Sequence, residues 1–264
     1  MNSLRVFLKL VGVSLRSQMQ YKASFWMLSA THFVSTFVDI FGIWILFDRF
    51  KVVKGWSFEE LALIYGVMQM GFAAAESAGR GFDGFGLVVK NGDFDRVLLR
   101  PLSSIMQIAA RDIQLMRIGR FFQGLVILVW GCSQLGIDLF STKSAVIALS
   151  LVGTTCLFYG LFVLQATICF WTTETLELMN ITTYGGLQAG QYPISIYNRY
   201  FQAFFTFVVP IGCVAYYPLA TLLQKEAVPF WLGAVVAPLW GVIFLAGACF
   251  AWRLGVRRYH STGG

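Results

Sequence analysis

Four polar residues in the first long apolar segment have the types and spacing for chemistry inside a membrane. They are Ser29, His32, Thr36 and Asp39. Their spacing of three, four and three residues places them on one face of a helix. A carboxylate at the depth expected for Asp39 costs about 2.5–3.5 kcal/mol, so it must face protein or water. We interpret this face either as a transport pathway or interface, or as a packing face that holds a protonated or hydrogen-bonded Asp39.

Two further sets of charges lie at the ends of apolar segments. Glu76 and Arg80 are four residues apart, so they are expected to pair near the membrane interface in a structural role. Glu174 and Glu177 follow another apolar segment, where they form either an acidic rim or a solvated helix end.

Motifs of the common hydrolases and nucleotide-binding proteins are missing. The chain has no GxxxxGK[ST] phosphate loop, no HExxH and no GxSxG. Its two histidines, His32 and His260, are far apart, and its five cysteines lie in apolar runs without a CxxC pair. We interpret the cysteines as small buried hydrophobic residues; they are Cys132, Cys156, Cys169, Cys213 and Cys249. A membrane enzyme is therefore the least supported class, and no metal site is expected.

The composition predicts that these residues work in a bilayer. Of the 264 residues, 57% are hydrophobic and 12% are charged, whereas soluble domains carry about 25% charged residues. The sequence therefore predicts an all-α integral membrane protein with about six transmembrane helices. The expected spans are Ala23–Phe47, Phe58–Gly79, Ile118–Ile137, Ala145–Trp171, Gln202–Tyr216 with its continuation, and Pro229–Trp252. Because Pro210 and Pro218 interrupt the fifth span, we expect a broken or re-entrant stretch near Tyr216–Leu223.

The basic residues predict the orientation of the spans. Most of the 20 Lys and Arg residues fall on one side of the membrane if the N-terminus is cytoplasmic. They lie in segments 5–22, 80–120 and 253–258 and at Arg199 in a second inner loop expected at 172–201. Both termini are therefore expected in the cytoplasm. This topology explains the net charge of +7 without a nucleic-acid partner.

Residues 1–22 are expected to precede the membrane domain. Arg5, Lys9 and Arg16 interrupt the apolar residues, so no cleavable signal peptide is expected. These basic residues share one side of a helix. The residues of the other side are Leu4, Leu8, Val11 and Leu15. This pattern favours an amphipathic helix in the inner interface, and the alternative is a helical extension of the first span.

The predicted inner loop 81–117 is the most informative segment. Its glycine-rich start permits a sharp exit from the membrane, and Leu87–Val89 form a short apolar helix face. Asn91–Asp93 is a turn signal, and Arg100–Pro101 ends the unit. A compact helical element of this kind suits docking on a soluble protein. The alternative is a simple connector.

Several motifs resemble those of one known family. The loop motif runs from Gly92 to Pro101, and Phe170–Glu174 closes the fourth predicted span. Two further matches follow in the C-terminal half; they are Gln191–Tyr197, and Phe207–Pro210 with Ala215–Pro218. In order and spacing, over nearly the whole chain, these segments resemble the ABC-2 type transporter permeases of bacteria.

The resemblance implies a six-helix permease half with a coupling helix between spans two and three and a broken outer segment between spans five and six. It divides the chain into an interfacial helix at 1–22, a transmembrane domain at 23–252 and a cytoplasmic tail at 253–264. The candidates for ATPase coupling are Phe85, Leu87, Val88, Gly92, Asp95, Arg100 and Pro101. In this hypothesis the docking surface consists of Phe85, Leu87 and Val88. Gly92 supplies the turn, and Asp95 and Arg100 pair locally.

The leading hypothesis is therefore a permease subunit of an ATP-driven ABC transporter, an exporter, in the bacterial inner membrane. The resemblance implies a separate dimer of ATPase subunits that binds ATP and Mg, so no cofactor is expected in this chain. It also implies a second permease half, either a copy of this chain or a homologue. The alternative is a stand-alone secondary transporter or channel that uses the polar face of the first span.

Overall fold

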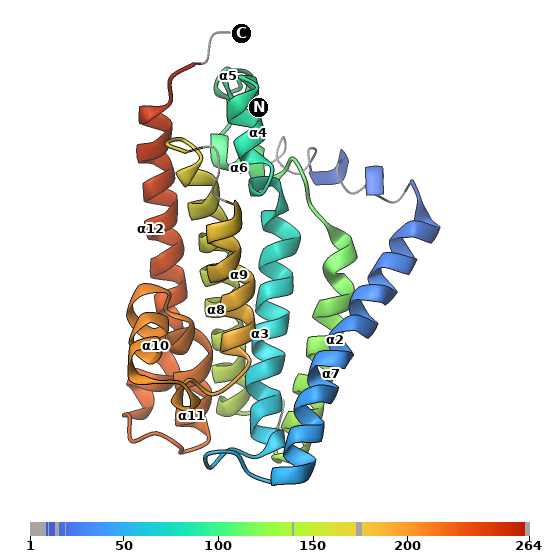
Figure 1. Cartoon of the computed structure of the whole chain (residues 1–264), viewed down its shortest axis with the longest axis vertical. Helices are drawn as coiled ribbons and strands as arrows, with labels where there is room; N and C mark the ends of the chain where they lie inside the picture. The colour runs from blue at the N-terminus through green and yellow to red at the C-terminus, as the bar shows by residue number, and fades with distance from the viewer. Residues whose placement is uncertain are drawn as a thin grey trace.

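The computed structural model describes residues 9, 11–13, 16–18, 20–138, 140–172 and 176–261, without the side chains of 176–179. These residues form helices and one isolated β-bridge, between Val53 and Trp56. The long helices run side by side as a bundle (Figure 1). The predicted all-α architecture is confirmed.

The long helices of the bundle are α2 (Lys22–Phe50), α3 (Phe58–Gly79), α7 (Ile118–Gln134), α8 (Thr142–Ile168), α9 (Leu176–Gly190) and α12 (Ala237–Arg258). Within the described residues, 5 helical segments are long and apolar enough to cross a membrane, and a bent helix pair raises this to up to 6. Side chains cap two of the long helices. Ser57 and Glu60 form a capping box at the start of α3, and the Ser141 hydroxyl accepts from the Ser144 N–H at the start of α8.

One end of the bundle carries a series of short helices, and we call it the basic end. They are η1 (Arg80–Phe82), α4 (Phe85–Lys90), α5 (Asp93–Leu98), α6 (Ser104–Ala109) and η2 (Leu115–Arg117). The last described residues of the chain lie at this end as well (Figure 1). The opposite end holds η3 (Ile194–Ile196), α10 (Arg199–Ala203), the π-helical turns η4 (Phe204–Val208), η5 (Gly212–Tyr216) and η6 (Trp231–Val236), and α11 (Tyr217–Leu222).

The core of the bundle is formed by α3, which packs between α7 and α8. Most residues in the apolar stretch of α3 are buried, whereas only 22% of the residues in the apolar stretches of α2 and α12 are buried. Small residues set the spacing between α8 and α12. A Cβ added at Gly241 of α12 would lie 2.0 Å from the Gly153 carbonyl oxygen of α8. The two backbones are therefore in direct contact, as is common for helices packed in a membrane.

The prediction of an inner loop at 172–201 is wrong, because α9 crosses the bundle in this region. Tyr184 lies beside Phe72 of α3, with ring centroids 5.3 Å apart. Further along, a Cβ at Gly190 would meet Met68. The chain then reaches the opposite end, where the Lys54 ammonium donates to the Ile196 carbonyl over 3.2 Å. Arg199 consequently lies at the end opposite to the other arginines that were expected beside it.

The sequence did not predict this crossing, because α9 is short and partly polar. It has 15 residues, and Asn180, Thr182, Thr183 and Gln188 interrupt its apolar pattern. A search for about 20 apolar residues therefore passes over it. The fifth crossing of the bundle is therefore α9, and not the expected span Gln202–Tyr216.

The segment expected to be broken is a re-entrant pair of helical segments. Arg199–Val208 and Gly212–Leu222 meet at 85°. Both ends of the pair lie near the loop after α2, because Ile196 contacts Lys54 and the Lys225 ammonium donates to the Gly55 carbonyl over 2.7 Å. The prediction of a broken or re-entrant stretch is confirmed. Its break lies at 209–211, around Pro210, and not near Tyr216–Leu223, since Pro218 lies within the continuous helical segment Gly212–Leu222.

The N-terminal segment is described only in part. The described residues between 9 and 18 lie across the end of the bundle before α2 begins (Figure 1). The amphipathic pattern rests largely on residues outside the described ranges; these are Leu4, Arg5, Leu8 and Leu15. The interfacial helix therefore stays a prediction. The acidic rim does too, because Glu174 and the side chain of Glu177 are not among the described residues.

Candidate functional site

The helical loop at the basic end is held to the bundle by a cluster of aromatic rings. The Phe85 ring of α4 lies 5.2 Å from Phe94 of α5, 4.8 Å from Trp252 of α12 and 5.1 Å from Phe170. Phe85 and Phe94 are fully buried. Aromatic pairs at these separations each add about 0.5–1.5 kcal/mol beyond the area that they bury. The loop is therefore a packed extension of α8 and α12.

A tight turn joins α4 and α5 into a compact hairpin. Asn91 donates its N–H to the Leu87 carbonyl over 2.9 Å, and Gly92 follows with a φ of 71°. This left-handed conformation is strained for residues with a Cβ, which explains the glycine. The expected turn at Gly92 is confirmed.

The apolar residues that the hairpin exposes differ from those expected. Leu87 is 65% exposed, and Leu99 after α5 is 85% exposed. The predicted docking surface of Phe85, Leu87 and Val88 needs correction, because Phe85 is fully buried and Val88 is 5% exposed. The sequence pattern could not separate the two faces, since both faces of such a short helix carry apolar residues.

The expected local pair of Asp95 and Arg100 is also absent from the described residues. The Asp95 carboxylate instead accepts from the Ser261 hydroxyl over 2.6 Å. Burial and the neighbouring Asp95 carboxylate raise the pKa of Tyr259. Asp95 therefore ties α5 to the segment after α12, while Arg100 and Pro101 lie exposed at the end of the hairpin.

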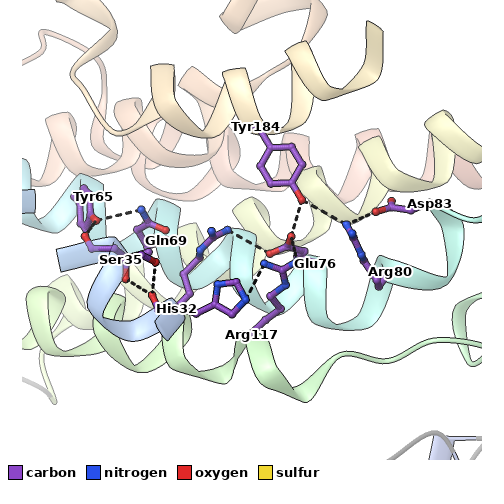
Figure 2. Close-up of polar contacts among 11 residues, drawn as sticks. His32, Ser35, Tyr65, Gln69, Glu76, Arg80, Asp83, Arg117 and Tyr184 are labelled. Atoms are coloured by element: carbon purple, nitrogen blue, oxygen red, sulfur yellow. Dashed lines mark hydrogen bonds and ion pairs between the residues drawn. The ribbon is translucent and has the colours of Figure 1, made fainter. Parts of the chain in front are cut away.

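Beneath this loop, a buried ion network joins three helices (Figure 2). Glu76 of α3 is fully buried and pairs with the guanidinium groups of Arg117, at 3.4 Å, and Arg120, at 3.3 Å. The Tyr184 hydroxyl of α9 donates to the same carboxylate over 2.7 Å. The Arg120 guanidinium also lies over the Phe72 ring, 5.4 Å from its centroid. One carboxylate thus holds α3, α7 and α9 together.

The network replaces the pair expected between Glu76 and Arg80. Arg80 forms an ion pair with Asp83, at the point where α3 gives way to the short helices, and it lies 3.5 Å from the Tyr184 hydroxyl. Sequence spacing suggested the neighbour four residues away. The partners of Glu76 come from 41 and 44 residues further along the chain, and sequence spacing carries no signal for them.

The polar face of the first span is divided by the structure. Ser29 and Thr36 are buried on α2, and the Thr36 carbonyl accepts from the Tyr65 hydroxyl of α3 over 2.9 Å. His32 lies 3.3 Å from the Arg117 guanidinium. Asp39 is exposed in the single chain. Three of the four residues therefore form a packing face, and Asp39 is not buried in it.

A second polar group, which sequence reasoning missed, lies deeper in the bundle. The Tyr65 hydroxyl accepts from the side-chain amides of Gln69, over 3.2 Å, and Gln123, over 3.3 Å. All three side chains are buried between α2, α3 and α7. Together with the Glu76 network they form a chain of polar groups along the inside of the bundle. Two glutamines inside predicted spans were the signal that was available in the sequence.

Among the residues that the structure describes, the cysteines and the acidic residues form no site for a metal. Within the described residues, no three His, Cys, Asp or Glu side chains come together in a suitable group. The five cysteines are free thiols, buried or half-buried along the helices.

The long apolar helices and the re-entrant pair define a multi-pass membrane protein. A family model described as ABC-2 family transporter protein matches residues 33–263. The chain therefore belongs to the ABC-2 transporter family, and it is a permease of the ABC-2 type. Permeases of this family are the membrane component of ABC transporters and work with ABC ATPase partners. No curated protein and no solved structure matches the chain.

Proposed function

We propose that the α4–α5 hairpin is the surface on which a separate ATPase dimer drives this permease. The observation that carries the proposal is the contrast between its two faces. One face exposes Leu87 and Leu99 at the basic end, and the other is fixed to α8 and α12 through Phe85 and Phe94. A force applied to the exposed face reaches the bundle directly, because packed aromatic cores resist deformation.

In this proposal the basic end faces the cytoplasm of a bacterial cell, in agreement with the placement of the arginines. ATP and Mg bind to the partner ATPases, and this chain needs no cofactor of its own. The movement of the hairpin passes to α12 through the aromatic cluster and to α3 through η1. The substrate is exported along the interface between two permease halves.

Replacing Leu87 by aspartate is expected to abolish stimulation of the partner ATPase while the permease still inserts and folds. An exposed apolar anchor at a protein interface contributes about 2 kcal/mol, which corresponds to roughly thirtyfold weaker binding. The measurement is the ATPase activity of the reconstituted complex, with co-purification of the two chains. Gly92→Val should act in the same direction, because it disfavours the turn.

Val52→Asp serves as the control, since Val52 is 55% exposed in the loop at the opposite end. It should leave ATPase stimulation unchanged. Normal stimulation in the Leu87 variant would remove the hairpin from its assigned role.

We further propose that the second permease half is a copy of this chain, and that it packs against the exposed face of α2. This face carries Thr31, Ser35 and Asp39, all exposed in the single chain. Polar groups facing hydrocarbon are costly, and a carboxylate is the most costly of them. A protein partner on this face would remove that cost.

In a cysteine-free background, Ser35→Cys is expected to cross-link two copies of the chain in membranes. Ile243→Cys is the matched control, because Ile243 is an exposed residue of α12 (55%), and α2 and α12 lie on opposite sides of the bundle (Figure 1). The readout is the dimer band on a denaturing gel. Cross-linking through residue 243 and none through residue 35 would place the interface on the other side.

The stand-alone transporter gains less support from the structure. Such a pathway would use the whole polar face of the first span, yet Ser29 and Thr36 are packed against the neighbouring helices. Asp39→Asn is the discriminating variant, because it should leave ATP-dependent transport largely intact if Asp39 lies only at an interface between subunits.

A further inference from the structure

A large polar cavity lies at the basic end, beside the hairpin. Its volume is ≈ 700 Å³. It is bounded by the N-terminal segment on one side and by α5, α6 and the residues after α6 on the other. The charged residues that line it are Asp93, Arg96, Arg100, Arg111 and Asp112.

Two glutamines fix the walls of this cavity. The Gln18 side chain accepts from the Leu115 N–H over 3.0 Å and donates to the Ile113 carbonyl, so it joins the N-terminal segment to the stretch before α7. The Gln107 amide donates to the carbonyls of Val97, over 2.9 Å, and Leu102, over 3.0 Å, and thus joins α6 to α5. Amides that each bridge two backbone groups hold the space open in one shape.

The charges around the cavity leave two arginines unpaired within the described residues. Asp93 pairs with Arg96 at 3.5 Å, and Asp112 accepts from the side chain of Gln114 over 3.3 Å. Arg100 and Arg111 have no carboxylate partner there, and both are exposed. The cavity therefore presents two guanidinium groups, which favour the oxygens of a phosphate.

The position of the cavity favours a lipid as the source of that phosphate. Its lining residues directly precede the two apolar helical segments that begin at Lys22 and Leu115, so it lies at the boundary of the membrane. Val13, Val97 and Ile108 give it an apolar part next to the arginines. An acyl chain with an anionic headgroup matches this combination, and basic pockets at helix ends are suited to such headgroups.

We propose that this cavity binds the phosphate headgroup of an anionic phospholipid, through Arg100 and Arg111. The lipid joins the N-terminal segment to the hairpin, and it thereby couples the hairpin to the state of the bilayer. This inference does not depend on the identity of the transported substrate or on the partner ATPase.

The test is native mass spectrometry of the purified full chain with added phosphatidylglycerol, phosphatidylcholine or inorganic phosphate. The wild-type chain is expected to retain phosphatidylglycerol in preference to phosphatidylcholine. Arg100→Gln with Arg111→Gln should weaken that retention by about thirtyfold, since each arginine near an anionic lipid contributes about fivefold. The double Lys variant, which keeps both charges, should retain most of the binding.

Arg258→Gln is the matched control, because Arg258 is an exposed arginine at the same end that does not line the cavity. It should bind phosphatidylglycerol like the wild type. Equal retention of phosphatidylcholine, or full retention in the double Gln variant, would overturn the proposal. Displacement of the lipid by an equal concentration of inorganic phosphate would assign the site to free phosphate instead. Weaker co-purification of the ATPase with unchanged lipid retention would assign the two arginines to the protein partner.

Discussion

Glu76→Ala is expected to lower the stability of the permease by about 3–5 kcal/mol, because it leaves Arg117 and Arg120 buried without their counter-charge. The carboxylate is fully buried and also accepts from Tyr184, so no water replaces it readily. Loss of this group releases α9 from α3 and α7 at the basic end. Thermal unfolding of the purified protein in detergent measures the effect.

Asp48→Asn is the control for this prediction. Asp48 also forms an ion pair, with Lys51 at 3.5 Å, but both side chains are more than half exposed. Exposed pairs contribute little, so its unfolding temperature should stay near that of the wild type. Glu76→Gln keeps the shape of the side chain and should fall between the two. Equal stability of Glu76→Ala and the wild type would mean that the network does not hold the helices together.

Gly241→Leu is expected to separate α8 from α12 and to cost about 3 kcal/mol or more in stability, as overpacking of a tight contact does. A Cβ at this position would lie 2.0 Å from the Gly153 carbonyl oxygen, and backbone atoms cannot move aside as a flexible side chain can. The aromatic cluster below the hairpin depends on the same helix pair, so coupling to the ATPase should fall as well.

Gly247→Leu is the matched control on the same helix. An added Cβ there meets nothing within 4 Å, and leucine favours helix more than glycine does. Its stability should equal or exceed that of the wild type. The comparison is made by the fraction of folded protein that survives heating and size-exclusion chromatography. Similar losses in both variants would point to a general intolerance of α12 to larger side chains.

The sequence was sufficient to predict the helices that face lipid or the bundle core with long apolar runs. It located α2, α3, α7, α8 and α12 because a membrane demands about 20 such residues from each spanning helix. It failed for α9, since this helix has only 15 residues and polar side chains interrupt its apolar pattern. Arg199 was placed on the wrong side for the same reason.

The candidate site was predicted less completely. Gly92 was recognised because its turn is a local feature, with the required backbone conformation written in one residue. The roles of Phe85 and Val88 were not, because burial in a hairpin depends on Trp252, which lies far away in the sequence. The partners of Glu76 were hidden in the same way. Local chemistry was therefore visible in the sequence, and contacts between distant segments were not.

The shortness of α9 has a mechanical consequence. Its 15 residues cover about 22 Å, whereas the hydrocarbon layer is about 30 Å thick. Residues 191–198 continue the crossing with irregular backbone around the short η3. A side chain satisfies a backbone group that a longer helix would have paired, since the Tyr197 hydroxyl donates to the Ala189 carbonyl over 3.1 Å. Exposed peptide groups of this kind cannot be turned toward lipid tails. The part of this crossing that follows α9 must therefore move as one rigid unit with its neighbours during any transport cycle. Hinge motion is then confined to other parts of the molecule.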